Sequence, residues 1–76
     1  MKSDAHRELF YLTKRVIQKA NYEGHDHVAV NLRQHRLGQL SMRDIKKFKK
    51  YWKKKGWICI RDGIDGMSGE FVLRKE

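Results

Sequence analysis

The chain has 76 residues, and its 18 lysines and arginines against nine acids give a formal net charge of +9 at pH 7. This length predicts a single domain over 1–76 with a small core, and a charged fraction of 36% excludes a membrane protein. Because 11% of the residues are aromatic, the composition also argues against a disordered chain. An uneven positive charge of this size points to a polyanionic partner.

The cysteine content and the first residues bear on where the protein works. Cys59 is the only cysteine, so no disulfide can form within the chain, and its apolar neighbours predict a buried thiol in a reducing compartment. The first ten residues lack the apolar stretch of a secretory signal, and no run approaches the ~20 apolar residues of a membrane span. We therefore expect a protein that is not secreted and has no membrane partner. It would be cytoplasmic and nucleoid-associated, or nuclear if the source is eukaryotic or viral.

The first predicted element is a helix over about 4–22. Its apolar residues recur at spacings of three and four and form one stripe: Ala5, Leu9, Leu12, Val16 and Ala20. The opposite face is solvated and basic, with Arg7, Lys14, Arg15 and Lys19. We expect this helix to serve as a scaffold.

The second predicted element is a shorter helix over about 27–37, although its pattern has two interpretations. Val28, Val30 and Leu32 alternate with polar residues, as in a strand. The run "NLRQHRL" contains good helix formers, and Gly38 stands where a C-cap residue would. On this second ground we favour the helix.

A third helix is predicted over about 42–55. Ser41 can cap it, with Asp44 three residues later in the manner of a capping box, and Gly56 can end it. After Gly56 the apolar period changes to two, and "WICIRD" and "EFVLRK" are rich in β-formers on either side of the glycine-rich "GIDGMSG". This predicts a hairpin over about 57–75. The fold class is therefore α+β, with three helices followed by a two-stranded antiparallel β-hairpin.

The third helix separates apolar from charged residues. Residues 41–57 carry eight of the 18 lysines and arginines and one acid, Asp44. At 100° per residue, Ile45, Phe48 and Trp52 fall on one side and can fasten the helix to the core. The opposite side carries Arg43, Lys46, Lys47, Lys50 and Lys54, with Lys53 at its edge.

These cations have few acids near them in the sequence. Like charges three or four residues apart repel by a few tenths of a kcal/mol per pair, and a solvated helix face usually mixes both signs. Lys49 and Lys55 fall nearer the apolar side of the same helix. The uncompensated positive face indicates nucleic-acid binding.

The segment "VAVNLRQHRLGQLSMRDIKKFKKYWKKKGW", followed by "ICIRDGIDGMSGEFVLR", resembles a winged helix-turn-helix DNA-binding domain. The resemblance lies in Leu40-Ser41 before the third helix, in its apolar residues, and in Gly56-Trp57 after it. It implies that the third helix is the recognition helix in the major groove and that the hairpin loop is the wing. The family usually has a small strand before its second helix, which this sequence does not clearly predict.

The resemblance also implies roles for single residues. Arg43 is the best candidate for a base contact, since its planar fork can pair with guanine. Candidates close to it are Gln39, Ser41, Lys46 and Lys47. Candidates for phosphate contacts are Lys50, Lys53 and Lys54 on the helix and Arg61, Arg74 and Lys75 on the hairpin. The loop tip would lie near a minor groove, although Asp62, Asp65 and Glu70 would repel phosphates, so contact and plain solvent exposure of the wing both stay open.

Lysine mainly supplies electrostatic grip, so we expect substantial non-specific affinity with a modest sequence preference. The expected function is a DNA-binding protein, acting as a small transcriptional regulator or as a DNA-architectural or recombination factor. One alternative is a structured-RNA or ribosome-associated protein. Another is a protein-interaction module or inhibitor whose basic helix docks on an acidic protein partner. A homodimer also stays open.

Metal binding and catalysis have little support in the sequence. His25, His27, His35 and Cys59 do not show the spacing of a zinc module. The acids are dispersed, the hydroxyl residues lack an obvious base partner, and no glycine-rich phosphate loop precedes a helix. We therefore expect no metal, no cofactor and no enzymatic activity.

Overall fold

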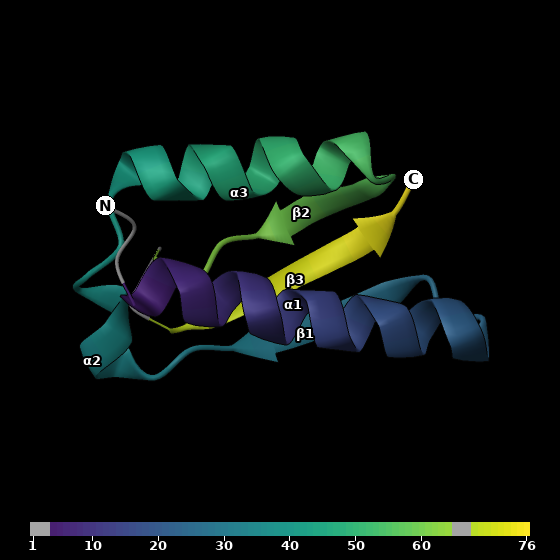
Figure 1. Cartoon of the computed structure of the whole chain (residues 1–76), viewed down its shortest axis with the longest axis horizontal. Helices are drawn as coiled ribbons and strands as arrows, with labels where there is room; N and C mark the ends of the chain where they lie inside the picture. The colour runs from purple at the N-terminus through teal and green to yellow at the C-terminus, as the bar shows by residue number, and fades with distance from the viewer. Residues whose placement is uncertain (1–3, 65–67) are drawn as a thin grey trace.

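The computed structural model of the chain describes residues 4–64 and 68–76, in which a three-stranded antiparallel sheet packs against two long helices (Figure 1). The elements follow in the order α1 (Asp4–Glu23), β1 (His27–Asn31), α2 (Gln34–Leu37), α3 (Met42–Lys54), β2 (Trp57–Arg61) and β3 (Glu70–Lys75). The strand order in the sheet is β1-β3-β2. The fold is therefore α+β, as the sequence predicted.

The predicted helix over 27–37 is wrong. Residues 27–31 form β1, in which Val28 and Val30 are buried and their neighbours are exposed, and α2 is a single turn. On a helix Val28 and Val30 would point about 200° apart, so they could not share one buried face. On a strand they both face the core, and β3 offers an edge for β1 to pair with.

The prediction of a two-stranded hairpin is also wrong, because β3 has a partner on each side. β3 pairs with β1 so that Leu73 lies opposite Val28 and Phe71 opposite Val30. Its other edge pairs with β2, where the register shifts between Cys59 and Arg61. β3 is therefore the central strand, and its two faces differ: Phe71 and Leu73 are fully buried, whereas Arg74 is exposed.

The core lies between the helices and the buried face of the sheet. α1 covers β1, and α3 runs beside α1 over β2 (Figure 1). Phe48 of α3 contacts Phe71 of the sheet and Phe10 of α1, with ring centroids 5.8 and 5.4 Å apart. Within the described ranges, no helix is both long and apolar enough to span a membrane.

Gly69 closes the end of the sheet. Its N–H donates to the carbonyl of Gly63 at 2.9 Å, and its own carbonyl accepts from the Leu32 N–H at 2.7 Å. Its φ is +75°, and a Cβ at this position would overlap the Leu32 carbonyl oxygen. Glycine is therefore required at position 69 for two reasons: the backbone has a positive φ, and there is no space for a Cβ.

Substitution of Gly69 is expected to destabilise the fold more than substitution of Gly24, which has a φ of +78° and open space around a built Cβ. Gly24→Ala should lower the free energy of unfolding by about 1–2 kcal/mol through its backbone conformation alone. Gly69→Ala adds the overlap with Leu32 and should cost more than about 3 kcal/mol. Urea denaturation followed by tryptophan fluorescence measures both. Equal losses would mean that the Leu32 backbone moves aside at little cost.

Candidate nucleic-acid interface

The candidate interface is built on α3, which begins with a capping box. The Asp44 N–H donates to Ser41 Oγ at 3.1 Å, and the Ser41 N–H donates to Asp44 Oδ2 at 3.2 Å. These two bonds satisfy backbone donors that the first turn would otherwise leave unpaired. The negative charge of Asp44 also lies at the positive end of the helix dipole. The start of α3 is therefore fixed by local sequence.

One side of α3 is packed into the core, as its apolar spacing predicted. Ile45, Phe48 and Trp52 are at most 4% exposed. Trp52 stacks on Phe10 of α1 at 6.5 Å between ring centroids, and Tyr51 meets the same Phe10 ring edge-on at 5.2 Å. Together with the contact of Phe48 with Phe71 of the sheet, these contacts with α1 fix the orientation of α3 about its own axis. The predicted buried face is confirmed.

The other side of α3 is exposed and basic. The exposed cations are Arg43, Lys46, Lys47, Lys50, Lys53 and Lys54. Within residues 4–64 and 68–76, none of these six side chains forms an ion pair. The acid within α3 is Asp44, whose pKa is lowered mainly by the hydrogen bond from the Ser41 N–H, with smaller effects of His6 and Lys47. The structure thus brings the predicted α3 residues together on one charged surface.

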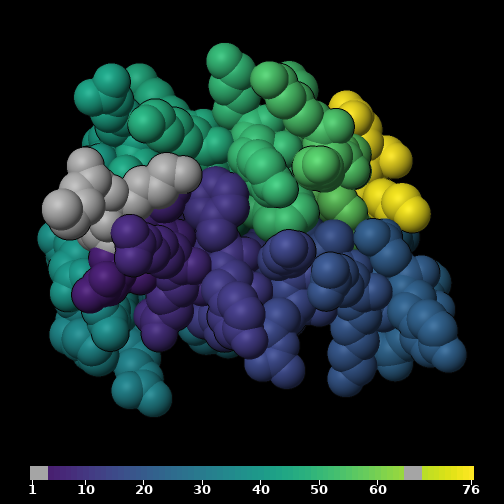
Figure 2. Space-filling view, viewed as in Figure 1, coloured from purple at the N-terminus to yellow at the C-terminus, as the bar shows by residue number. Residues whose placement is uncertain are grey.

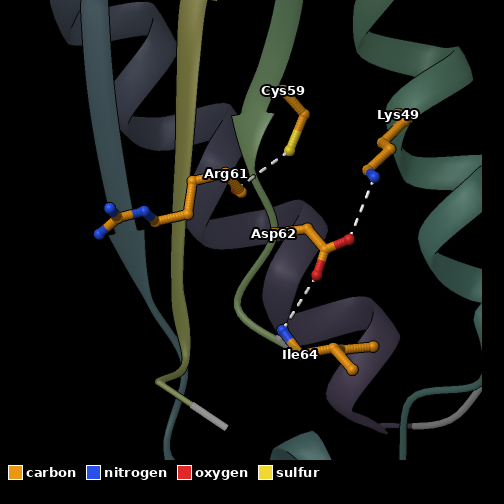
Figure 3. A network of polar contacts seen from close by, with 5 residues as sticks. All are labelled: Lys49, Cys59, Arg61, Asp62 and Ile64. Carbon is orange, nitrogen blue, oxygen red and sulfur yellow. Dashed lines mark hydrogen bonds and ion pairs between the residues drawn. The ribbon is translucent and has the colours of Figure 1, made fainter. Parts of the chain in front are cut away.

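Lys49 differs from these cations because it is tied to the hairpin. Its Nζ lies 3.1 Å from Asp62 Oδ2, and Asp62 Oδ1 accepts from the Ile64 N–H at 3.1 Å (Figure 3). Asp62 therefore joins α3 to the turn that follows β2. Its negative charge is turned toward α3 and compensated there. Nothing in the sequence signals this pairing of residues 13 positions apart.

A surface hollow of about 540 Å³ lies beside this ion pair. It is lined by Lys49, Cys59, Ile60, Arg61, Asp62 and Ser68. The half-buried Cys59 thiol donates to the Arg61 carbonyl at 3.2 Å, and burial raises the pKa of the thiol, so it stays protonated near neutral pH. In the described part of the chain, no group of His, Cys, Asp and Glu side chains could hold a metal ion.

The basic residues of the hairpin do not join the α3 surface as one cluster. Arg61 donates to Glu70 at 2.9 Å, and its side chain points away from α3 (Figure 3). Arg74 is paired with Ile58 and alternates with buried Leu73, which places it on the open face of the sheet. Lys75 follows at the end of β3. The loop tip expected near a minor groove includes residues 65–67, which lie outside the described residues.

Gln39 and Ser41 lie just before α3 and are both exposed. The Ser41 hydroxyl is engaged as the helix cap, while Gln39 lies in the turn after α2.

His25 and His27, just before and at the start of β1, are exposed, and His27 Nδ1 lies 2.8 Å from Asp26. This contact holds the pKa of Asp26 below its ordinary value. His25 Nε2 lies 3.8 Å from Glu23, so both histidines contact acids close to them in the sequence.

Comparison with protein-family models, with curated proteins and with solved structures finds no match to this chain.

The capping box makes part of the stability depend on pH. Because the folded state lowers the pKa of Asp44, its contribution is present above the ordinary pKa of 3.8 and is lost as the pH falls through the lower, folded value. Asp44→Asn should therefore destabilise the protein at pH 7, and this difference from the unchanged protein should shrink toward pH 2.5. Ser41→Ala should cost about 1 kcal/mol. Urea denaturation across this pH range provides the measurement; a difference independent of pH would contradict the assignment.

Proposed function

We propose that the chain binds nucleic acid, with double-stranded DNA as its partner, through the exposed face of α3. The observation that carries this proposal is the six exposed cations of α3, none of which is ion-paired within the described ranges, on a helix held by a buried aromatic underside. Such a face repels itself and gains free energy when phosphates replace its counterions. A duplex offers phosphates at the spacing and density that a rigid row of cations can meet.

The shape of the element also favours a duplex. α3 has 13 residues and is about 20 Å long, and a helix with its side chains, roughly 10–12 Å across, fits a major groove about 12 Å wide. β1 stands where winged helix-turn-helix domains have the small strand before their second helix, which adds support to that resemblance. In this arrangement α3 enters the groove and the sheet and α1 lie behind or beside it.

The residue types on α3 suggest how the contacts are divided. Arg43 lies exposed in the first turn, where its planar fork can reach a guanine edge. The lysines that follow act as point charges on the phosphate backbone. Affinity then comes mostly from the backbone, which suits a small transcriptional regulator or a DNA-architectural factor with modest sequence preference.

The first test is a fluorescence anisotropy titration with duplex DNA at several salt concentrations. Phosphate contacts by the five exposed lysines of this face give a slope of log K against log salt of about −4.5, and loss of three contacts makes it shallower by about three. We expect this for the triple variant Lys47→Ala, Lys50→Ala, Lys54→Ala. The control triple variant Arg15→Ala, Lys19→Ala, Arg33→Ala removes the same charge away from α3.

Duplex RNA and heparin in the same titration separate the alternatives. Loss on DNA that exceeds the loss on RNA and heparin supports the groove arrangement. An equal loss of affinity in the α3 variant and the control variant would mean that the protein binds DNA through its net charge alone, which would contradict the proposed role of α3. Binding that does not change with salt, or no binding to any polyanion, would overturn it.

A second prediction concerns Arg43 alone. Arg43→Lys keeps the charge but removes the two parallel donors that can read guanine. On a duplex chosen by selection from random sequences, the variant should lose about 1–3 kcal/mol of discrimination against unselected DNA. Its affinity for unselected DNA should hardly change. Unaltered discrimination would assign Arg43 to the backbone contacts.

A further inference from the structure

The contact between Phe10 and Tyr51 brings a second row of cations next to α3. Phe10 of α1 packs against Tyr51, Phe48 and Trp52 of α3. The surfaces of the two helices accordingly lie against each other across one face of the molecule (Figure 2). Residues one turn before and after Phe10 therefore lie on the side of α1 next to α3. The same holds for residues one turn before and after Tyr51 on α3.

Cations occupy these neighbouring positions on both helices. Arg7 and Lys14 are three and four residues from Phe10, and Lys47 and Lys54 are four and three residues from Tyr51. All four side chains are exposed. In each pair the two residues are seven apart, or about 10.5 Å along the helix. Two basic pairs of equal length thus flank one aromatic contact.

The acids of α1 are directed elsewhere. Asp4 and Glu8 both approach Arg36 of α2, at 3.9 and 3.8 Å, and Glu23 lies at the far end beside His25. On α3, Asp44 is held in the capping box and lies 3.6 Å from His6. Among residues 4–64 and 68–76, neither Arg7 nor Lys14 forms an ion pair. The surface on both sides of the Phe10–Tyr51 contact is therefore predominantly positive.

Tyr51 supplies a polar group at the centre of this surface. It is 42% exposed, and Lys55 Nζ lies 5.6 Å from the centroid of its ring. The ring makes T-shaped contacts with Phe10 and Trp52, which hold it in place. A phenol hydroxyl can donate a hydrogen bond to a phosphate oxygen.

We propose that α1 is a second part of the binding surface, and that the nucleic-acid backbone crosses from α3 onto Arg7 and Lys14 beside the Tyr51 hydroxyl. This inference rests on the nucleic-acid function proposed above. It assigns α1, which the sequence suggested was only a scaffold, two phosphate contacts of its own. A backbone that spans two helices also fixes the angle at which the nucleic acid lies on the protein.

The test uses a double variant and a control on the same helix. Arg7→Ala with Lys14→Ala removes two charges beside α3. Arg15→Ala with Lys19→Ala removes two charges from another side of α1, where they line a shallow hollow with Leu12 and Val16. In the duplex titration, the first variant should make the salt slope shallower by about two, and the control should leave it nearly unchanged. Tyr51→Phe should weaken binding severalfold without changing the slope.

The outcomes separate this inference from the one before it. Suppose that the unchanged protein binds and that the α3 triple variant loses binding. If the two α1 variants then behave alike, the contact with α1 is overturned, and the proposal for the α3 surface is kept. If the unchanged protein does not bind, both proposals fail. Urea denaturation of each variant should show an unchanged midpoint, which ensures that the comparison concerns binding.

Discussion

The packing of the aromatic side of α3 is the interaction on which the rest of the structure depends. Phe48 touches a ring on α1 and a ring on the sheet, so it joins all the layers of the molecule. Burial of each large apolar side chain contributes about 1.5–3 kcal/mol, whereas each like-charge pair on the exposed side costs only a few tenths. Burial of Ile45, Phe48 and Trp52 therefore exceeds the repulsion, and a helix with this much charge can remain ordered.

The positions of the acids decide where the positive charge is effective. Asp62 is paired with Lys49, Glu70 with Arg61, and Asp4 and Glu8 with Arg36. Such exposed pairs add little to stability. They do direct the acids toward the hairpin and α2, so the outer surfaces of α3 and the adjoining side of α1 keep an excess of cations. Where the unpaired cations lie on the surface thus depends on these side-chain pairings as well as on the net charge.

The sheet provides the support on which this surface is held. β3 lies between β1 and β2, and the bonds of Gly69 to Gly63 and Leu32 connect the end of β1 with the base of the β2–β3 loop. A central strand paired on both edges leaves fewer unpaired backbone groups than an isolated hairpin, which is marginal in water. The buried face of the sheet receives both helices, with α1 over β1 and α3 over β2, and its other face carries Arg74.

The sequence by itself determined the elements whose signals are local. The caps and apolar spacing of α3, the stripe of α1 and the two strands of the hairpin depend on residues a few positions apart, as does the separation of Ile45, Phe48 and Trp52 from the cations. Only the tertiary structure decided between strand and helix at 27–31, because Val28 and Val30 become a strand when the edge of β3 is there to pair with them. The same is true of the Lys49–Asp62 tether and the Phe10–Tyr51 contact, which join residues 13 and 41 positions apart. Pairings of this kind follow from how the chain folds back on itself, and no local pattern encodes them.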